Sequence, residues 1–165
     1  MDSAAFVARL DRSVTPEEIR DLQYSVGWSG GDPEDWPSCI EHSLCVATAR
    51  DISGNELVGI GFLAGNARHA QLVDFTVHPR AQRHGVAGQL VRLCLGFVAE
   101  HGIKYVGLTW AESSPWLKDF YFRAGFREIH NAMWLEESII RANASGRPVP
   151  RLNHDQTIKR PNSNI

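Results

Sequence analysis

The segment VHPRAQRHGVAGQL, from Val77 to Leu90, predicts a glycine-centred turn between a strand and a long apolar helix. The preceding run LVDFTV, from Leu72 to Val77, is typical of a largely buried strand, and Pro79 ends it because proline has no N–H to donate to a neighbouring strand. Gly85 can adopt a positive φ and has no Cβ, so consecutive backbone N–H groups can converge beside the positive end of the helix dipole. The turn is therefore predicted to bind a pyrophosphate.

Other phosphate sites also place a glycine before a helix, so this turn alone leaves alternatives open. Dinucleotide and nucleoside-triphosphate sites carry G-x-G-x-x-G or G-x-x-x-x-G-K-[ST], and neither pattern occurs in the chain. The remaining alternative is a loop whose glycine serves only the turn. A second motif further along the chain favours the cofactor site.

That second motif is SPWLKDFYFRAGFRE, from Ser114 to Glu128, which predicts an amphipathic helix followed directly by a strand that begins at Phe126. Gly125 suits the left-handed conformation that commonly ends a helix. The residues predicted to share one helix face, at i, i+3, i+4 and i+7, are Leu117, Phe120, Tyr121 and Ala124.

The chain resembles the GCN5-related N-acetyltransferase (GNAT) family over roughly Leu44 to Glu137. The resemblance rests on the Q-x-x-G-x-A pattern at Gln82, Gly85 and Ala87, followed by F-Y and then G-F. The resemblance implies an α/β (α+β) fold with a central mixed, mostly antiparallel sheet of about seven strands, splayed between the fourth and fifth, and about four flanking helices. It also implies acetyl-CoA as cosubstrate, without a metal, and acetyl transfer from the thioester to a primary amine in a ternary complex.

The same resemblance assigns the contacts with the cofactor. Arg80 is expected to be only a solvated residue at the rim of the turn. Ser114 stands where many relatives have an asparagine, and it can make one such hydrogen bond but not two. The expected cofactor-binding residues are Phe75, Thr76, Val77, Gln82, Arg83, His84, Gly85, Val86, Ala87 and Ser114.

Acyl transfer to an amine needs a neutral nucleophile, a donor for the developing oxyanion and a proton source for the departing thiolate. The resemblance gives the last role to Tyr121, whose phenol is a weaker acid than a thiol and should donate a strong hydrogen bond more than a full proton. Asp74 is the first candidate for the base, provided that burial raises its pKa or a water chain intervenes. His78, Glu112 and a purely structural Asp74 are the alternatives.

The rest of the chain predicts a strand–helix order that fits this fold. Thr15, Pro16 and Glu18 form a capping box that starts a helix running to Gly27, and a second short helix passes through Cys39 and Ile40 after a loop. The predicted strands are Ala4 to Leu10, Leu44 to Ala49, Leu57 to Leu63, Leu72 to Val77, Lys104 to Trp110, Phe126 to Ile129 and Ala132 to Leu135. Residues 1–140 are expected to form a single domain, and residues 141–165 a loosely packed tail.

Composition and charge exclude several classes of protein. Seventeen basic residues against 19 acidic residues provide no positive field for nucleic acid, and no run approaches the roughly 18 apolar residues of a membrane-spanning helix. No signal peptide is recognised, and three cysteines without C-x-x-C spacing fit a reducing cytoplasm. The expectation is a cytoplasmic protein, and the resemblance is compatible with a homodimer, as many relatives are.

The acceptor is expected to be a small-molecule amine or a peptide amine. The acidic residues Asp32, Glu34 and Asp35 could attract a cationic acceptor or could belong to an ordinary solvated loop. An acyl-CoA-binding module without catalytic activity is the alternative function, since a fold does not fix an activity. Each tryptophan could either line an acceptor pocket or pack in the core, and the five are Trp28, Trp36, Trp110, Trp116 and Trp134.

Overall fold

The computed structural model describes residues 5–109 and 115–128, which belong to two compact units. The second unit contributes one helix, α4 (Pro115–Arg123). The elements of the first unit are β1 (Phe6–Leu10), α1 (Pro16–Ser25), α2 (Trp36–His42), β2 (Cys45–Asp51), β3 (Leu57–Gly65), β4 (His69–Val77), the 3-10 helix η1 (Pro79–Ala81), α3 (Val86–Glu100) and β5 (Tyr105–Leu108). This order confirms the predicted succession of strands and helices as far as β5.

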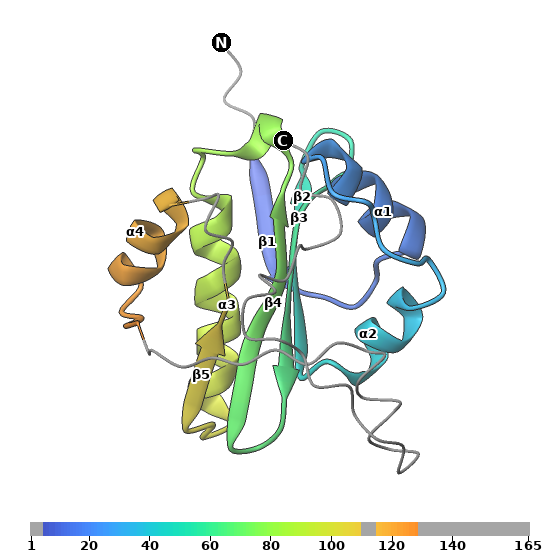
Figure 1. The fold of residues 1–165 in the computed structure, drawn as a ribbon. Helices are drawn as coiled ribbons and strands as arrows, with labels where there is room; N and C mark the ends of the chain where they lie inside the picture. The colour runs from blue at the N-terminus through green and yellow to red at the C-terminus, as the bar shows by residue number, and fades with distance from the viewer. Residues whose placement is uncertain (1–4, 110–114, 129–165) are drawn as a thin grey trace, which may run out of the picture. The chain divides into compact units, whose positions relative to one another are not determined.

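The sheet of the first unit has the strand order β1-β2-β3-β4-β5. The first three pairings are antiparallel, and β4 pairs with β5 in parallel because the α3 crossover returns the chain to the same end of the sheet. Helices α1 and α2 cover one face of this sheet and α3 covers the other (Figure 1). The predicted mixed, mostly antiparallel sheet is confirmed for the part of the chain that the structure describes.

The predicted closing strands fall largely outside the described residues. Of the Phe126–Ile129 strand, residues 126–128 are described and are not assigned to a strand. The strand from Ala132 to Leu135, the tail 141–165 and two of the tryptophans, Trp110 and Trp134, lie outside the described ranges.

The start of α1 confirms the predicted capping box. The amide of Glu18 donates to the Thr15 hydroxyl at 3.2 Å, and the amide of Thr15 donates to the Glu18 carboxylate at 2.9 Å. The same carboxylate accepts a hydrogen bond of 2.6 Å from Arg50 on β2, and this bond holds the pKa of Glu18 below its ordinary value. The cap therefore fixes both the first turn of α1 and its position against the sheet.

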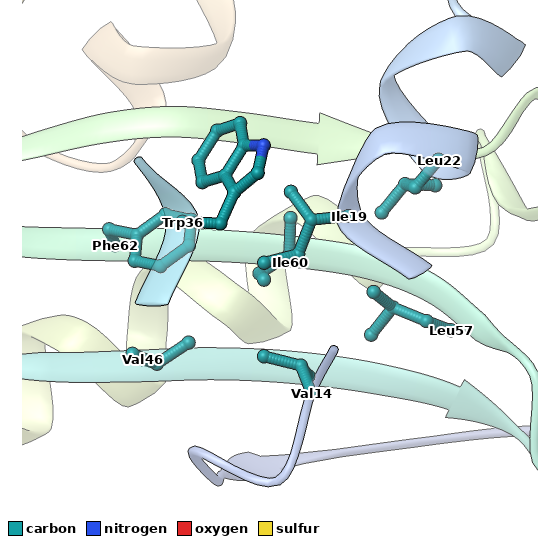
Figure 2. Close-up of a cluster of buried hydrophobic side chains, with 8 residues drawn as sticks. All are labelled: Val14, Ile19, Leu22, Trp36, Val46, Leu57, Ile60 and Phe62. Atoms are coloured by element: carbon teal, nitrogen blue, oxygen red, sulfur yellow. The ribbon is translucent and has the colours of Figure 1, made fainter. Parts of the chain in front are cut away.

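One hydrophobic core lies between α1, α2 and the sheet. The indole of Trp36 stacks on the ring of Phe62 with centroids 5.9 Å apart, and its Nε1 donates to the Gly30 carbonyl at 3.0 Å (Figure 2). Trp36 is only 6% exposed, so of its two predicted roles the structure supports core packing, and lining of an acceptor pocket is wrong for this residue. The cluster consists of Val14, Ile19, Leu22, Trp36, Val46, Leu57, Ile60 and Phe62.

Among the element boundaries that differ from the sequence prediction, those of β4 and α2 have local causes. Strand β4 begins at His69, three residues before Leu72, because the Asn66 side chain accepts hydrogen bonds from the amides of Arg68 (2.9 Å) and His69 (3.0 Å) and so closes a tight turn. Helix α2 begins at Trp36, where a loop was expected, because burial of the indole outweighs the loop-like composition around it.

The opposite face of the sheet is covered by α3. Its buried residues are Val86, Leu90, Val91 and Cys94. The Cys94 sulfur lies 4.0 Å from the sulfur of Cys45 on β2, and both buried cysteines are free thiols. Among the described residues, none of the helices is both long and apolar enough to cross a membrane.

Truncation of Ile60 to alanine should lower the free energy of unfolding by about 2–5 kcal/mol, because the side chain is fully buried and would leave a cavity between the sheet and α1. Ile52→Ala removes the same atoms from a side chain that is 61% exposed, and it should change stability by less than about 0.5 kcal/mol. Urea unfolding of the two variants checks this, and equal losses would contradict the assigned core.

Candidate functional site

The pairing of β3 with β4 is interrupted by an extra residue on β4. Ile60 faces Thr76 and Phe62 faces Val73, so the single residue between them on β3, Gly61, lies opposite two residues of β4, Asp74 and Phe75. Asp74 has φ +52°, in the left-handed region. These features define a β-bulge, which bends the strand and increases its local twist.

Gly61 makes this bulge possible. A Cβ built at Gly61 would lie 2.6 Å from ring atoms of Phe75, so the ring rests directly on the backbone of β3. The Cβ position of Gly59, which lies on the same face, is 3.0 Å from Val86 and 3.2 Å from Leu90 of α3. The Phe75 ring therefore lies on the α3 face of the sheet. The sequence prediction missed the bulge, although the alternating glycines of G-I-G-F in β3 were a possible signal of such a close approach.

Beyond the bulge, β4 lacks a described partner on its β5 side. Strand β5 pairs only with the first four residues of β4, from His69 to Leu72. The rest of β4, Val73 to Val77, continues past that pairing and holds the expected cofactor residues Phe75, Thr76 and Val77. An exposed strand edge of this kind can accept an extended ligand through main-chain hydrogen bonds.

The turn that follows is built by its own side chains. The His78 Nδ1 atom accepts a hydrogen bond of 3.2 Å from the amide of Arg80 and caps η1. The side-chain amide of Gln82 donates to the carbonyl of Val77 at 3.0 Å, which fastens the turn to the end of β4. Arg83 and Gly85 then adopt φ values of +63° and +78°. A Cβ at Gly85 would have no atom within 4 Å, so the positive φ, not crowding, is what favours glycine there.

Among the described residues, the amides at the start of α3 form a run without a hydrogen-bond acceptor. The amide of Gln89 bonds to the carbonyl of Gly85, so the amides of Val86, Ala87 and Gly88 precede the first bond of the helix. No side chain caps this helix start. Within the described part of the chain, no backbone acceptor is recorded for the amides of residues 83–85 either. Together with the dipole of the helix, these amides provide the geometry that binds phosphate groups.

The side chains around the turn have different roles. The Nδ1–H of His84 donates to the carbonyl of Gln82 at 2.8 Å, and its ring lies edge-on to Phe6 with centroids 5.8 Å apart. Arg83 is exposed. Arg80 is 42% exposed, but its guanidinium donates to the carboxylate of Asp51 at 2.9 Å and also pairs with Glu56. The expectation that Arg80 is only a solvated rim residue is therefore wrong.

Asp74, the first candidate for the base, faces α2. Its carboxyl retains contact with solvent, but the surrounding protein removes enough water to raise its pKa above the ordinary value of 3.8. The pKa of the Cys39 thiol on α2 is raised by burial and then by the charges of Asp74 and Asp35, which places both carboxylates near this thiol. Of the alternative bases, His78 uses Nδ1 to cap η1, and Glu112 lies outside the described residues, as does Ser114.

In the second unit, Tyr121 lies on α4 between two aromatic rings. Its ring meets Phe120 edge-on at 5.0 Å and Phe126 edge-on at 5.7 Å, and the side chain is 9% exposed. Burial raises the pKa of this phenol above 10, so the hydroxyl stays protonated at neutral pH and can act as a hydrogen-bond donor. The chain leaves the helix at Gly125 with φ +97°, as predicted from the sequence.

Replacement of Gly61 by alanine should destabilise the protein by about 1–3 kcal/mol, because the new Cβ would displace the Phe75 ring and distort the bulge. Gly96→Ala, in the middle of α3, is the matched control. A Cβ there meets nothing within 4 Å, and the change should stabilise the helix by up to about 1 kcal/mol. Thermal unfolding of both variants measures the difference, and a neutral Gly61→Ala would mean that the close contact is unimportant.

Comparison with known proteins places this geometry in a family. A family model described as the Acetyltransferase (GNAT) family matches residues 14–126. No curated protein matches the chain.

Among solved structures, a GNAT-family acetyltransferase from Streptococcus pneumoniae is 25% identical, with a TM-score of 0.66 over 81% of this chain and 99% of that chain. A probable acetyltransferase from meticillin-resistant Staphylococcus aureus is 19% identical, with a TM-score of 0.69 over 80% of this chain and 99% of that one. The aminoglycoside N-acetyltransferase AAC(6′)-Iy, in complex with CoA, is 15% identical, with a TM-score of 0.66 over 82% of this chain and 96% of that one. The last two likenesses concern the fold alone.

The family match includes the bulged strand, the turn at Gly85 and the helix that carries Tyr121. It covers more than half of the 165 residues. This chain belongs to the GNAT acetyltransferase family.

Proposed function

We propose that this protein is an acetyl-CoA-dependent N-acetyltransferase that moves the acetyl group to a primary amine by direct attack in a ternary complex. The observation that carries the proposal is the succession of two backbone features in the first unit. The β4 edge from Val73 to Val77 lies beyond the pairing with β5, and the unpaired amides at the start of α3 follow it after one turn. An extended pantetheine arm and a diphosphate are the two parts of coenzyme A that would use these features.

The proposed cofactor-binding residues follow this division. The β4 residues would contact the pantetheine arm through their backbone, and the turn residues would contact the diphosphate through amides and, for Arg83, through a charged side chain. Ser114 is proposed as a further contact with the pantetheine. The full set is Phe75, Thr76, Val77, Gln82, Arg83, His84, Gly85, Val86, Ala87 and Ser114.

The chemistry assigned to the chain's own residues is proton transfer and charge stabilisation. When bound, acetyl-CoA would supply the thioester carbonyl carbon, where a C–N bond forms and the C–S bond breaks. Asp74, whose raised pKa makes it a better base than an ordinary aspartate, would take the proton from the amine directly or through water. Amides of the β4 edge would donate to the carbonyl oxygen as negative charge develops, and the protonated Tyr121 would donate to the departing sulfur.

We propose a small-molecule amine or a peptide amine as the acceptor. Two carboxylates, Asp74 and Asp35, lie near Cys39 on the α2 side of the sheet, and both would favour a cationic amine. Trp28, in the loop before α2, is 43% exposed and could add a cation–π contact. A bisubstrate complex of AAC(6′)-Iy contains an acetylneamine, and that neighbour is consistent with an amine acceptor here.

Residues 1–140 are proposed to act as one domain, with residues 141–165 as a tail, because the family match runs through both described units. A cytoplasmic location and a homodimer complete the proposal. The cysteine pattern supports the location, and many relatives are dimers.

Release of free thiol from acetyl-CoA, measured across a panel of amines, tests the proposed activity. Tyr121→Phe should lower kcat by about 100-fold with little effect on coenzyme A affinity, because the sulfur loses its donor while the β4 edge and turn remain. Tyr105→Phe removes the same atom from an exposed tyrosine on β5 and should have no effect. Binding of coenzyme A without turnover of any amine would instead indicate an acyl-CoA-binding module, and absence of binding would refute the proposal.

The role of Asp74 predicts a specific pH dependence. The carboxylate is the active form, so kcat/KM should fall as pH falls through its raised pKa, with a midpoint above 3.8. Asp74→Asn should lower kcat by about 100-fold and remove this acid limb. A weakly basic acceptor should be used, so that protonation of the amine itself does not produce the limb. An unchanged pH profile in the Asn variant would exclude Asp74 as the base.

A further inference from the structure

We propose that Arg80 is a positioning residue, whose ion pairs with Asp51 and Glu56 hold the turn Pro79–Gly85 in the conformation that presents its amides to a diphosphate. The inference rests on the proposed function, because it assumes that this turn binds coenzyme A. It assigns to the end of β2 and the β2–β3 loop, residues 51–56, a role in cofactor binding without any contact with the cofactor.

The carboxylate of Asp51 is a fixed partner for Arg80. One oxygen, Oδ2, accepts from the Arg80 guanidinium at 2.9 Å, and the other, Oδ1, accepts from the Ser53 amide at 2.8 Å and the Ser53 hydroxyl at 2.7 Å. Both oxygens are therefore occupied, and the side chain of Asp51 is largely buried. The bonds from Ser53, and then the charge of Arg80, lower the pKa of Asp51, so it stays ionised at neutral pH.

The segment that carries these carboxylates, residues 51–56, is itself held in place by hydrogen bonds. The amide of Asp51 donates to the Glu56 carbonyl at 3.0 Å, and the amide of Asn55 donates to the Asp51 carbonyl at 2.8 Å. Arg50 donates both to the Asn55 carbonyl at 2.8 Å and to the Glu18 carboxylate. The loop is thus tied to the start of α1, and it offers Arg80 a rigid anchor.

The turn needs such an anchor because part of its backbone is strained. Arg83 has a side chain but adopts a φ of +63°, a conformation that L residues rarely occupy. The strain persists only when the surroundings hold the segment at both ends. The Gln82 bond to Val77 and the Arg80 ion pairs hold the part of the turn before Arg83, and α3 begins directly after Gly85 at the other end.

The same ion pairs argue against Arg80 as a phosphate ligand. Its charge is already compensated by two carboxylates, which a diphosphate would have to displace. Arg83, by contrast, is exposed and has no ion pair within the described part of the chain. The two arginines of the turn therefore have different roles: Arg83 binds the diphosphate, and Arg80 positions the turn.

Glu56→Gln is the sharpest test, because Glu56 is exposed and, within the described ranges, its side chain bonds only to Arg80. This change should weaken coenzyme A binding by about threefold, and Arg80→Ala should weaken it by about tenfold, as expected for one and two partly exposed ion pairs. Arg80→Lys, which can keep one pair, should fall between them. The KM for S-acetyl-pantetheine, which lacks the diphosphate, and its kcat should stay unchanged in all three variants.

Arg68→Ala, which removes a positive charge at the other end of β4, is the control for a general charge effect and should leave coenzyme A binding unchanged. Amide hydrogen exchange provides a readout that does not depend on any ligand: exchange in residues 79–85 should accelerate in Glu56→Gln. If Glu56→Gln preserves or strengthens coenzyme A binding while Arg80→Ala weakens it, Arg80 is a direct ligand and the inference is wrong. If the wild-type protein does not bind coenzyme A, the proposed function fails as well, and the two failures are therefore distinguishable.

Discussion

The structure depends on the extra residue that β4 accommodates opposite Gly61. Because Gly61 has no side chain, the Phe75 ring can lie on the backbone of β3, and Asp74 can take the left-handed conformation that the bulge requires. The bend begins just after the last β4 residue that pairs with β5. One absent Cβ thus sets the direction of the strand segment from which both the β4 edge beyond the β5 pairing and the turn at Gly85 continue.

The two proposed substrate sites differ in the sign of their charges. On the side of α3, the helix dipole, the free amides and the exposed Arg83 create a site for an anion. On the side of α2, the charges of Asp74 and Asp35 act on Cys39, and both would favour the proposed cationic amine. Such a separation would keep the proposed polyanionic donor and cationic amine from competing for one position.

Sequence reasoning succeeded where the physical cause is local. The capping box of Thr15 and Glu18 and the positive φ of Gly85 and Gly125 each depend on residues within one turn of the chain, so the prediction and the structure agree. The bulge at Asp74 escaped prediction because its cause, Gly61, lies on another strand. The pairs made by Arg80 escaped it too, since their partners are 29 and 24 residues away in sequence.

The β2–β3 loop interacts both with the capped start of α1 and with the turn before α3. It receives Arg50 from the side where α1 is capped and Arg80 from the side of the turn, so the two arginines share one small segment as their support. Each guanidinium forms several bonds in one plane, which a lysine at the same position could not reproduce. A shift of this loop would therefore act on the start of α1 and on the turn Pro79–Gly85 together, although neither element contacts the other through these bonds. The loop lies outside both proposed substrate sites, yet the turn proposed to bind the diphosphate depends on it.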